Sequence, residues 1–128
     1  MQQEYNKRAK GADYEEMAAE YLRNQGYEII QKNYRNKQGE IDLIVKQHME
    51  FGYSSLVYVE VKYRSNMAYG DPLEAVDFRK QKRISRAASY HYARFGAPYG
   101  MGCRFDVIAI YGSGKIIHVE NAFDAISR

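Results

Sequence analysis

The sequence predicts an α/β domain in which helices pack on a mixed β-sheet. Segments whose apolar residues recur at helical spacing are interspersed with segments in which apolar and polar residues alternate, as in strands. The order along the chain is helix, two strands, helix, two strands, with room for an additional short strand at 27–31. Elements mixed in this order are typical of helices that cover a sheet. The 128 residues suit one domain spanning 1–128.

The first helix is expected at 12–25. Its apolar residues form one stripe of helical periodicity, made of Tyr14, Met17, Ala18, Tyr21 and Leu22. Asp13 and Glu16 have the spacing of a capping box at the start of a helix, and Gly26 suits the position after its end. Residues 33–39, by contrast, have a turn-like composition.

Two strands are expected next, at 40–46 and 56–64, joined by a loop that contains Gly52. Side chains alternate between the two faces of a strand. One face of the pair is apolar and is assigned to the core, with Ile41, Leu43, Val45, Val57, Val59, Val61 and Tyr63. The charged residues share the opposite face, and they are Glu40, Asp42, Glu60 and Lys62.

An antiparallel hairpin centred near Phe51 places Asp42 opposite Glu60 and Glu40 opposite Lys62. A slip by one residue would expose an apolar face, whereas a slip by two residues stays open. Two opposed carboxylates repel each other and need a cation between them. Lys62 supplies part of that charge, and Mg²⁺, which takes oxygen ligands, would supply more. The alternative is that these charged residues only form a solvent-exposed polar face of the hairpin.

The second helix is expected to open at 71–74, where Asp71 is placed to cap it, and a break before its longer part stays open. The apolar stripe of the longer part is Ile84, Ala87, Ala88, His91, Tyr92 and Phe95, and the helix should end at Gly96. Residues 104–111 and 116–120 then read as a strand hairpin around the turn at 112–115.

Composition limits the classes of function. The net charge of +3 is compatible with nucleic-acid binding without being specific for it. The apolar segments are too short for a membrane span, and the N-terminus lacks the apolar region of a secretory signal. Cys103 is the single cysteine, so no disulfide framework exists, and we expect a reduced, cytoplasmic setting. No glycine-rich phosphate loop is present, which argues against nucleotide-driven work.

An acid followed one strand later by Glu-x-Lys is the signature of the PD-(D/E)XK nuclease superfamily. Four segments in order make the likeness more specific: GEIDLIV (39–45), VYVEVKYR (57–64), RFDVI (104–108) and NAF (121–123). Together they resemble the YraN-like family of predicted endonucleases, which is similar to archaeal Holliday junction resolvases. The resemblance runs from about Gly11 to Phe123, although the proline that names the superfamily motif is missing.

This resemblance implies a restriction-endonuclease-like core and a Mg²⁺- or Mn²⁺-dependent endonuclease that hydrolyses DNA, with branched or single-stranded structures as candidate substrates. It makes Asp42, Glu60 and the backbone carbonyl of Val61 metal ligands. Lys62 would orient or activate the attacking water, and Glu15 would be an outer or second-metal ligand. The chemistry is coherent, because a bound metal lowers the pKa of water and stabilises charge on the phosphate. Resolvase-like enzymes use two active sites, so a homodimer is compatible with this function.

Helical phase sorts the remaining candidates. Glu15 lies at the edge of the first helix's apolar stripe, so it either reaches the site or is an ordinary flanking carboxylate. Lys80 and Gln81 continue the buried stripe of the second helix and are expected to reach the site or a phosphate. An outward basic patch suits phosphate contacts or is simply solvated, and it comprises Arg79, Lys82, Arg83 and Arg86.

The sequence leaves alternatives for several other residues and for the function as a whole. Glu40 is expected to pair with Lys62, either to position it or as a simple ion pair. Asp106 borders the site or makes a structural hydrogen bond, and we favour the second. The histidines His48, His91 and His118 share no metal-ligand spacing, and His91 is expected to pack in the core. A module on the same scaffold that binds nucleic acid or protein without cutting is the alternative to a nuclease.

Overall fold

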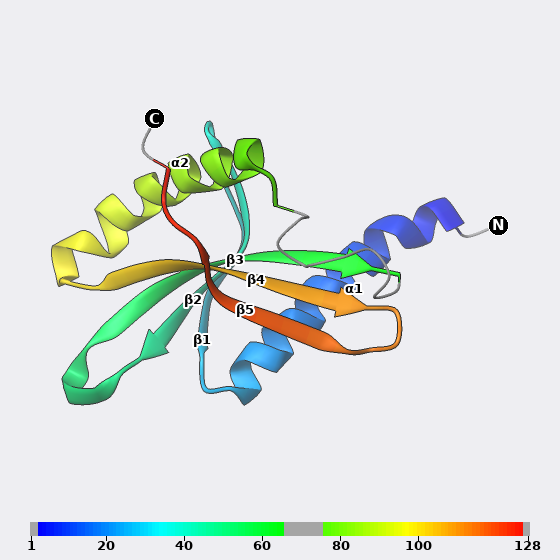
Figure 1. The fold of residues 1–128 in the computed structure, drawn as a ribbon, viewed down its shortest axis with the longest axis horizontal. Helices are drawn as coiled ribbons and strands as arrows, with labels where there is room; N and C mark the ends of the chain where they lie inside the picture. The colour runs from blue at the N-terminus through cyan, green and yellow to red at the C-terminus, as the bar shows by residue number, and fades with distance from the viewer. Residues whose placement is uncertain (1–2, 66–75, 127–128) are drawn as a thin grey trace.

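A computed structural model describes residues 3–65 and 76–126, and it shows one β-sheet flanked by two helices (Figure 1). The elements are α1 (Gln3–Asn24), β1 (Glu28–Asn36), β2 (Gly39–His48), β3 (Ser54–Arg64), α2 (Phe78–Phe95), β4 (Gly102–Tyr111) and β5 (Ile116–Phe123). Neither described helix is both long and apolar enough to cross a membrane.

The five strands lie in the sheet in the order in which they occur in the chain. β3 and β4 are parallel over ten residue pairs, from Ser55 and Gly102 to Arg64 and Tyr111, and the other neighbouring strands are antiparallel. α2 lies in the connection between the two parallel strands. The predicted α/β class, with a mixed sheet flanked by helices, is therefore confirmed.

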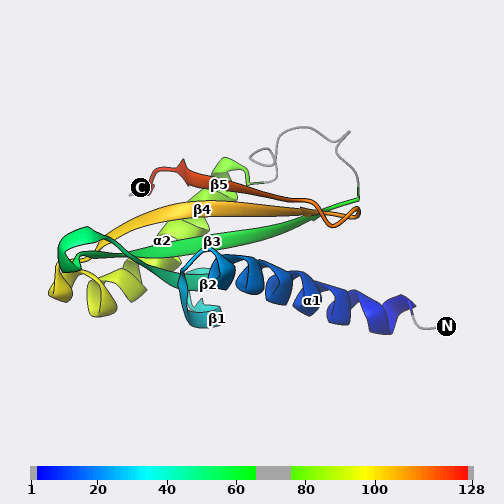
Figure 2. The same ribbon diagram turned by 90° about the horizontal axis from the view of Figure 1, so that it is seen from below.

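Both faces of the sheet are covered. Ala18, Ala19 and Leu22 of α1, which runs beside the sheet in Figure 2, pack with one core cluster that includes Leu43, Val45, Val57, Val59, Ile108 and Ile110. Ile84, Ala87 and Ala88 of α2 pack with the other, which includes Ile41, Ile44, Leu56, Tyr58, Phe105 and Val107. The face assigned above to charged residues is thus a second core surface. Ile41 packs in this second core, whereas it was predicted to share a core with Leu43.

The register predicted for the hairpin of β2 and β3 is confirmed. Leu43 pairs with Val59 and Ile44 with Tyr58, so the two-residue slip that the sequence left open does not occur. The ladder of paired residues ends at Leu43 and Val59. Beyond it the side chain of Asp42 accepts a hydrogen bond from the backbone N–H of Val61, at 2.8 Å. Where the pairing of β2 with β3 ends, the carboxylate of Asp42 therefore accepts the hydrogen bond of the Val61 N–H.

Two elements near the N-terminus are longer than predicted. α1 begins at Gln3 rather than at residue 12, so Asp13 lies inside the helix and caps nothing. Met17 of its predicted stripe is 38% exposed, and Ala19 is buried instead. β1 continues to Asn36, through residues predicted to be a turn. Asn33 accommodates a positive φ of 53° within this strand, which asparagine tolerates better than most residues.

The second half agrees closely with prediction. α2 starts after Asp77, whose Oδ1 accepts a hydrogen bond from the backbone N–H of Lys80 at 2.8 Å, and it ends at Gly96. The opening predicted at 71–74 lies outside the described residues. Of the predicted stripe, only the last residue, Phe95, is substantially exposed, at 48%. The hairpin of β4 and β5 forms as expected, with β5 extended to Phe123.

Candidate functional site

Two acids lie where β2 and β3 stop pairing. Asp42 is half-buried and holds the Val61 N–H, and Glu60, 6% exposed, is on the neighbouring strand. Both acids line the same cleft, so they share one side of the hairpin. The N–H of Val61 is engaged by Asp42, and its carbonyl stays a predicted ligand.

Two lysines converge on one oxygen of Glu60. The Nζ of Lys62 lies 3.1 Å from Glu60 Oε2, and the Nζ of Lys80 lies 2.6 Å from the same atom. Lys62 follows Glu60 by two residues on β3, whereas Lys80 comes from the first turn of α2. The structure thus brings Lys80, a residue expected to reach the site or a phosphate, into direct contact with an acid.

The site carries more negative charge than its environment favours. Burial, reinforced by the charges of Glu60 and Glu15, raises the pKa of Asp42 to about 7 despite the hydrogen bond from Val61. Burial and the adjacent Lys80 lower the pKa of Lys62. Functional sites frequently contain a carboxyl group whose pKa is raised by burial and by neighbouring acids.

Glu15 faces this group of acids. It is half-buried on α1, and burial raises its pKa, with Glu40 and Glu60 adding to the effect and a hydrogen bond from Asn33 opposing it. Its neighbour Glu16 is exposed and pairs with Arg23 and Lys32. Of these two glutamates, Glu15 is the more buried, and its charge acts on Asp42.

A cleft of about 540 Å³ opens over Asp42, Glu60 and Lys80. Its sides are the β1–β2 hairpin, which contributes Arg35, and α2, which contributes Arg83. The hairpin is held against the helix by a hydrogen bond from Asn36 Nδ2 to the carbonyl of Ala87, at 3.1 Å. Gly39 also approaches α2 so closely that a Cβ there would lie 3.2 Å from the Arg83 carbonyl oxygen. The acids therefore form the floor of a cleft with basic walls.

The basic patch of α2 is divided by its surroundings. Arg79, Arg83 and Arg86 are exposed, whereas Lys82 is half-buried. Gln81 is predicted to reach the site or a phosphate, and in the structure its Nε2 donates to the Val76 carbonyl at 2.9 Å. Its amide is used at the start of the helix, where the hydrogen bond fixes the preceding turn.

The expected pair between Glu40 and Lys62 is wrong. Glu40 lies opposite Arg35 in the ladder between β1 and β2, and its Oε2 is 2.9 Å from Arg35 Nε. Both side chains are largely exposed. The sequence does not predict this contact, because Arg35 lies among residues 33–39, whose composition is turn-like.

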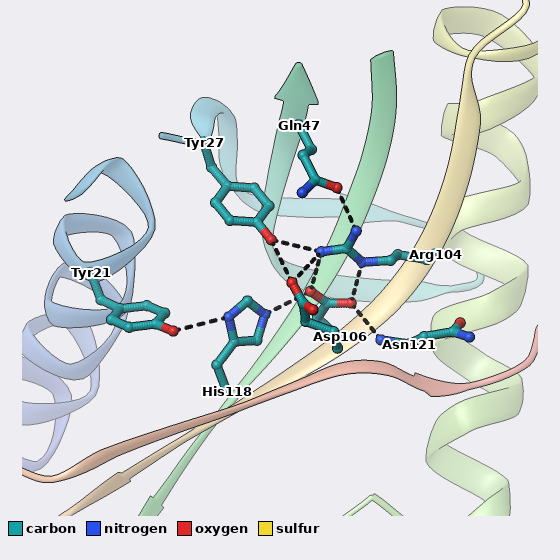
Figure 3. Close-up of polar contacts among 8 residues, drawn as sticks. Tyr21, Tyr27, Gln47, Arg104, Asp106, His118 and Asn121 are labelled. Carbon is teal, nitrogen blue, oxygen red and sulfur yellow. Dashed lines mark hydrogen bonds and ion pairs between the residues drawn. The ribbon is translucent and has the colours of Figure 1, made fainter. Parts of the chain in front are cut away.

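A second polar cluster lies elsewhere on the sheet, around Asp106 (Figure 3). This side chain is fully buried and accepts hydrogen bonds from Arg104 Nε at 2.9 Å, His118 Nε2 at 2.7 Å and the Asn121 N–H at 3.0 Å. Burial alone would raise the pKa of Asp106, but the hydrogen bonds from His118, Arg104 and Asn121 outweigh it and lower the pKa. The structural role favoured for Asp106 is therefore what its contacts show.

The second cluster has the ligand types of a metal site, but an arginine already neutralises its acids. Asp106, His118 and Glu120 bring potential ligand atoms within 4.8 Å of one another. The guanidinium of Arg104 already bridges Asp106 and Glu120, with Nη2 at 3.2 Å from Glu120 Oε1 and 2.7 Å from the hydroxyl of Tyr27. An arginine in this position supplies the positive charge itself. His91 lies apart, buried against Tyr58, and its packing role is confirmed.

The chemistry of the first cluster does fit a divalent cation. Its donors are the carboxylates of Asp42 and Glu60, which line the cleft, and hard cations such as Mg²⁺ prefer oxygen ligands of this kind. Among the described residues, Glu15 does not bring a third ligand atom within 4.8 Å of both, and it acts on Asp42 through its charge. Lys80 places an ammonium group on Glu60, which shows that this position attracts positive charge. Glu60 and Glu15 still raise the pKa of Asp42, so a further cation would relieve their repulsion.

Comparisons with known proteins agree with the motifs. The model of the uncharacterised protein family UPF0102 matches residues 14–110. The chain is 43% identical over 120 residues to a UPF0102 protein from Lachnoclostridium phytofermentans, covering 94% of this chain and 97% of the relative. It is 43% identical over 119 residues to one from Clostridioides difficile, covering 92% and 99%. A relative from Persephonella marina is 37% identical over 115 residues, covering 90% and 93%.

Among solved structures, Pyrococcus furiosus SfsA in complex with Ca²⁺ is similar over 89% of this chain and 63% of that chain. The chain thus spans less than two thirds of SfsA. The TM-score is 0.33 and the identity 16%, which are too low to support an argument about function.

Proposed function

The chain belongs to the uncharacterised protein family UPF0102, the YraN family, and from this premise and the geometry of its acidic cleft we propose that it is a metal-dependent endonuclease acting on DNA. The resemblance noted from its motifs is confirmed at the level of the family. The activity is the further step, and it rests on the site rather than on any relative.

One observation carries the proposal. Asp42 and Glu60 meet at the floor of an open cleft, and the pKa of Asp42 is raised to about 7 by burial and by Glu60. A structural role would not require two acids to be held together in this way. A cation that binds both would offset the repulsion, and a phosphodiester is the kind of substrate that a metal between carboxylates activates.

Each residue has a distinct role in the proposal. Asp42, Glu60 and the Val61 carbonyl hold Mg²⁺ or Mn²⁺, and Glu15 is an outer or second-metal ligand. The metal, when bound, lowers the pKa of water and stabilises negative charge on the phosphate. Lys62, anchored beside Glu60 at 3.1 Å, orients the attacking water and stabilises the same charge.

The walls of the cleft suit the DNA backbone. Arg35 and Arg83 line it, and further cations follow along α2 at Arg79, Lys82 and Arg86. Contacts of this kind bind phosphates without reading sequence. Branched or single-stranded DNA as substrate, a cytoplasmic setting and a homodimer with two active sites belong to the same proposal.

The test is cleavage of duplex, single-stranded and four-way-junction DNA by the purified protein in Mg²⁺ or Mn²⁺. Asp42→Ala and Lys62→Ala should each reduce the rate by about 100-fold or more, since each removes a group that stabilises the transition state. Glu15→Ala should reduce it less, and Glu16→Ala, the exposed neighbour, should leave it unchanged.

If no DNA is cut, or if the Asp42 and Lys62 variants cut as fast as the unmodified chain, the catalytic assignment is wrong. DNA that is bound in the cleft but left intact would instead favour the binding module considered above.

A further inference from the structure

We propose that Lys80 is a built-in competitor of the metal: its ammonium group occupies Glu60 in the metal-free protein, and metal binding displaces it into the cleft, where it becomes free to contact a phosphate. This inference rests on the proposed function, because it concerns the same site. It adds a coupling between the metal and the substrate that the roles given above do not contain.

The contacts on Glu60 make competition unavoidable. A carboxylate oxygen offers about two acceptor directions. At Glu60 Oε2, ammonium groups from Lys62 and Lys80 lie at 3.1 Å and 2.6 Å, so both directions are used. A metal that binds this oxygen must replace one ammonium, and a metal on the other oxygen would lie beside two positive charges.

Repulsion between positive charges leads to the same conclusion. A divalent cation bound by Asp42 and Glu60 would lie beside the ammonium groups of both Lys62 and Lys80. Displacement of one lysine relieves this repulsion.

Of the two lysines, Lys80 is the one placed to leave. It lines the cleft together with Arg83 and Arg35, and its side chain is 31% exposed, compared with 21% for Lys62. Lys62 is tied to Glu60 by their positions on one strand. Lys80 reaches Glu60 from α2, and its side chain can turn toward the basic wall without any change in the sheet.

Coupling between metal and DNA follows. In the metal-free protein Glu60 neutralises Lys80, which makes it unavailable to a phosphate. Metal binding releases Lys80, so metal and DNA should each strengthen the binding of the other, as linkage requires.

Calorimetric titration with Mn²⁺ at pH 8, without DNA, tests the competition directly. Lys80→Met removes the competing charge and keeps most of the length of the side chain, so it should bind Mn²⁺ roughly three- to tenfold more tightly than the unmodified chain. Lys37→Met is the matched control. It removes the same charge from an exposed position in the turn between β1 and β2, and it should bind with unchanged affinity.

Lysine NMR supplies a second readout. In the unmodified chain, addition of Mg²⁺ should shift the ¹³Cε signal of Lys80, whereas that of Lys37 should not move. Metal affinity that is unchanged or weaker in Lys80→Met overturns the inference. Equal tightening in both variants also overturns it, because the effect would then be one of net charge.

The outcomes separate the two proposals. If the unmodified chain binds Mn²⁺, Asp42→Ala abolishes that binding and Lys80→Met changes nothing, only the competition is wrong. Tighter binding by Lys80→Met, without DNA cleavage by the unmodified chain, supports the competition and contradicts the nuclease. If no variant binds Mn²⁺ at all, both proposals fail.

Discussion

The two acidic clusters of this sheet shift the pKa of a carboxylate in opposite directions. Asp106 is fully buried, yet hydrogen bonds from His118, Arg104 and Asn121 lower its pKa. Asp42 is only half-buried, yet its pKa is raised to about 7, because burial is reinforced by Glu60 and only one backbone N–H opposes it.

The comparison teaches that burial alone does not decide the state of an acid. What differs is the partner. Arg104 donates through Nε and Nη2 to the two oxygens of Asp106, at 2.9 and 3.1 Å, and so satisfies the group it neutralises. The ammonium groups of Lys62 and Lys80 lie on Glu60 and leave Asp42 with excess negative charge. A satisfied cluster stabilises the fold, whereas an unsatisfied one is available to a ligand.

The largest effect is expected at the satisfied cluster. Asp106→Ala should lower the free energy of unfolding by about 3 to 5 kcal/mol, because it leaves the mostly buried Arg104 without its main counter-ion. Urea unfolding measures this loss. A loss below about 1 kcal/mol would show that the cluster contributes little to the fold.

Asp42→Asn should have the opposite sign. Asparagine keeps an oxygen for the Val61 N–H and removes the charge that Glu60 repels, so the free energy of unfolding in metal-free buffer at pH 8 should rise by about 1 to 3 kcal/mol. The same urea experiment, with a chelator present, measures it. Asp77→Asn is a suitable control, because it replaces an acid by an amide at the cap of α2, away from Glu60. A loss of stability in Asp42→Asn would mean that Asp42 is already neutralised in the metal-free protein.

The pH dependence sharpens the same contrast. The folded pKa of Asp42, about 7, lies above its ordinary value of 3.8, so the folded state holds the proton more tightly. Its contribution to stability should therefore decline as the pH rises from about 4 to about 7 and stay constant above that. Asp106, whose folded pKa is lowered, should contribute fully above its ordinary value and lose its contribution as the pH falls below it.

The contribution of Asp42 can be isolated by comparing the unmodified chain with Asp42→Asn. The difference in their unfolding free energies is followed from pH 4 to pH 8. Saturating Mg²⁺ should flatten this difference, since a bound cation holds the carboxylate ionised. A difference that does not change with pH would contradict the raised pKa.

The smallest effect is expected at Glu40. Its pair with Arg35 is exposed, and such pairs contribute little. Glu40→Gln should change the free energy of unfolding by less than about 0.5 kcal/mol, in either direction, by the same measurement. A larger loss would assign Glu40 a supporting role in the cleft after all.

The parts of the fold that the sequence predicts are those where burial repeats along the chain. Leu43 and Val45 set the parity of β2 and its register with β3, whereas Ile41, beyond the ladder, packs in the other core cluster. The first turns of α1 and most of β1 carry no such pattern. β1 is an edge strand whose residues are mainly exposed, so its sequence looks like that of a loop.

The candidate site was predictable to the extent that its members lie on one hairpin. Asp42, Glu60 and Lys62 follow from the alternation and the register. The contact of Lys80 with Glu60 depends on how α2 crosses the sheet, which helical phase alone does not determine. The Asp106 cluster was beyond reach for the same reason, because Tyr27, Arg104 and Glu120 meet only in three dimensions.

Because β3 and β4 are parallel, the chain must return along the sheet between them, and α2 makes part of this return. All the acids of the candidate site, namely Glu15, Asp42 and Glu60, come before it, whereas Lys80 and Arg83 lie within it. A chimera that takes its crossover from another member of the family would keep its own carboxylates and exchange the cations that face the cleft. For protein engineering, the floor and one wall of the cleft therefore belong to separate segments of the chain, which can be recombined.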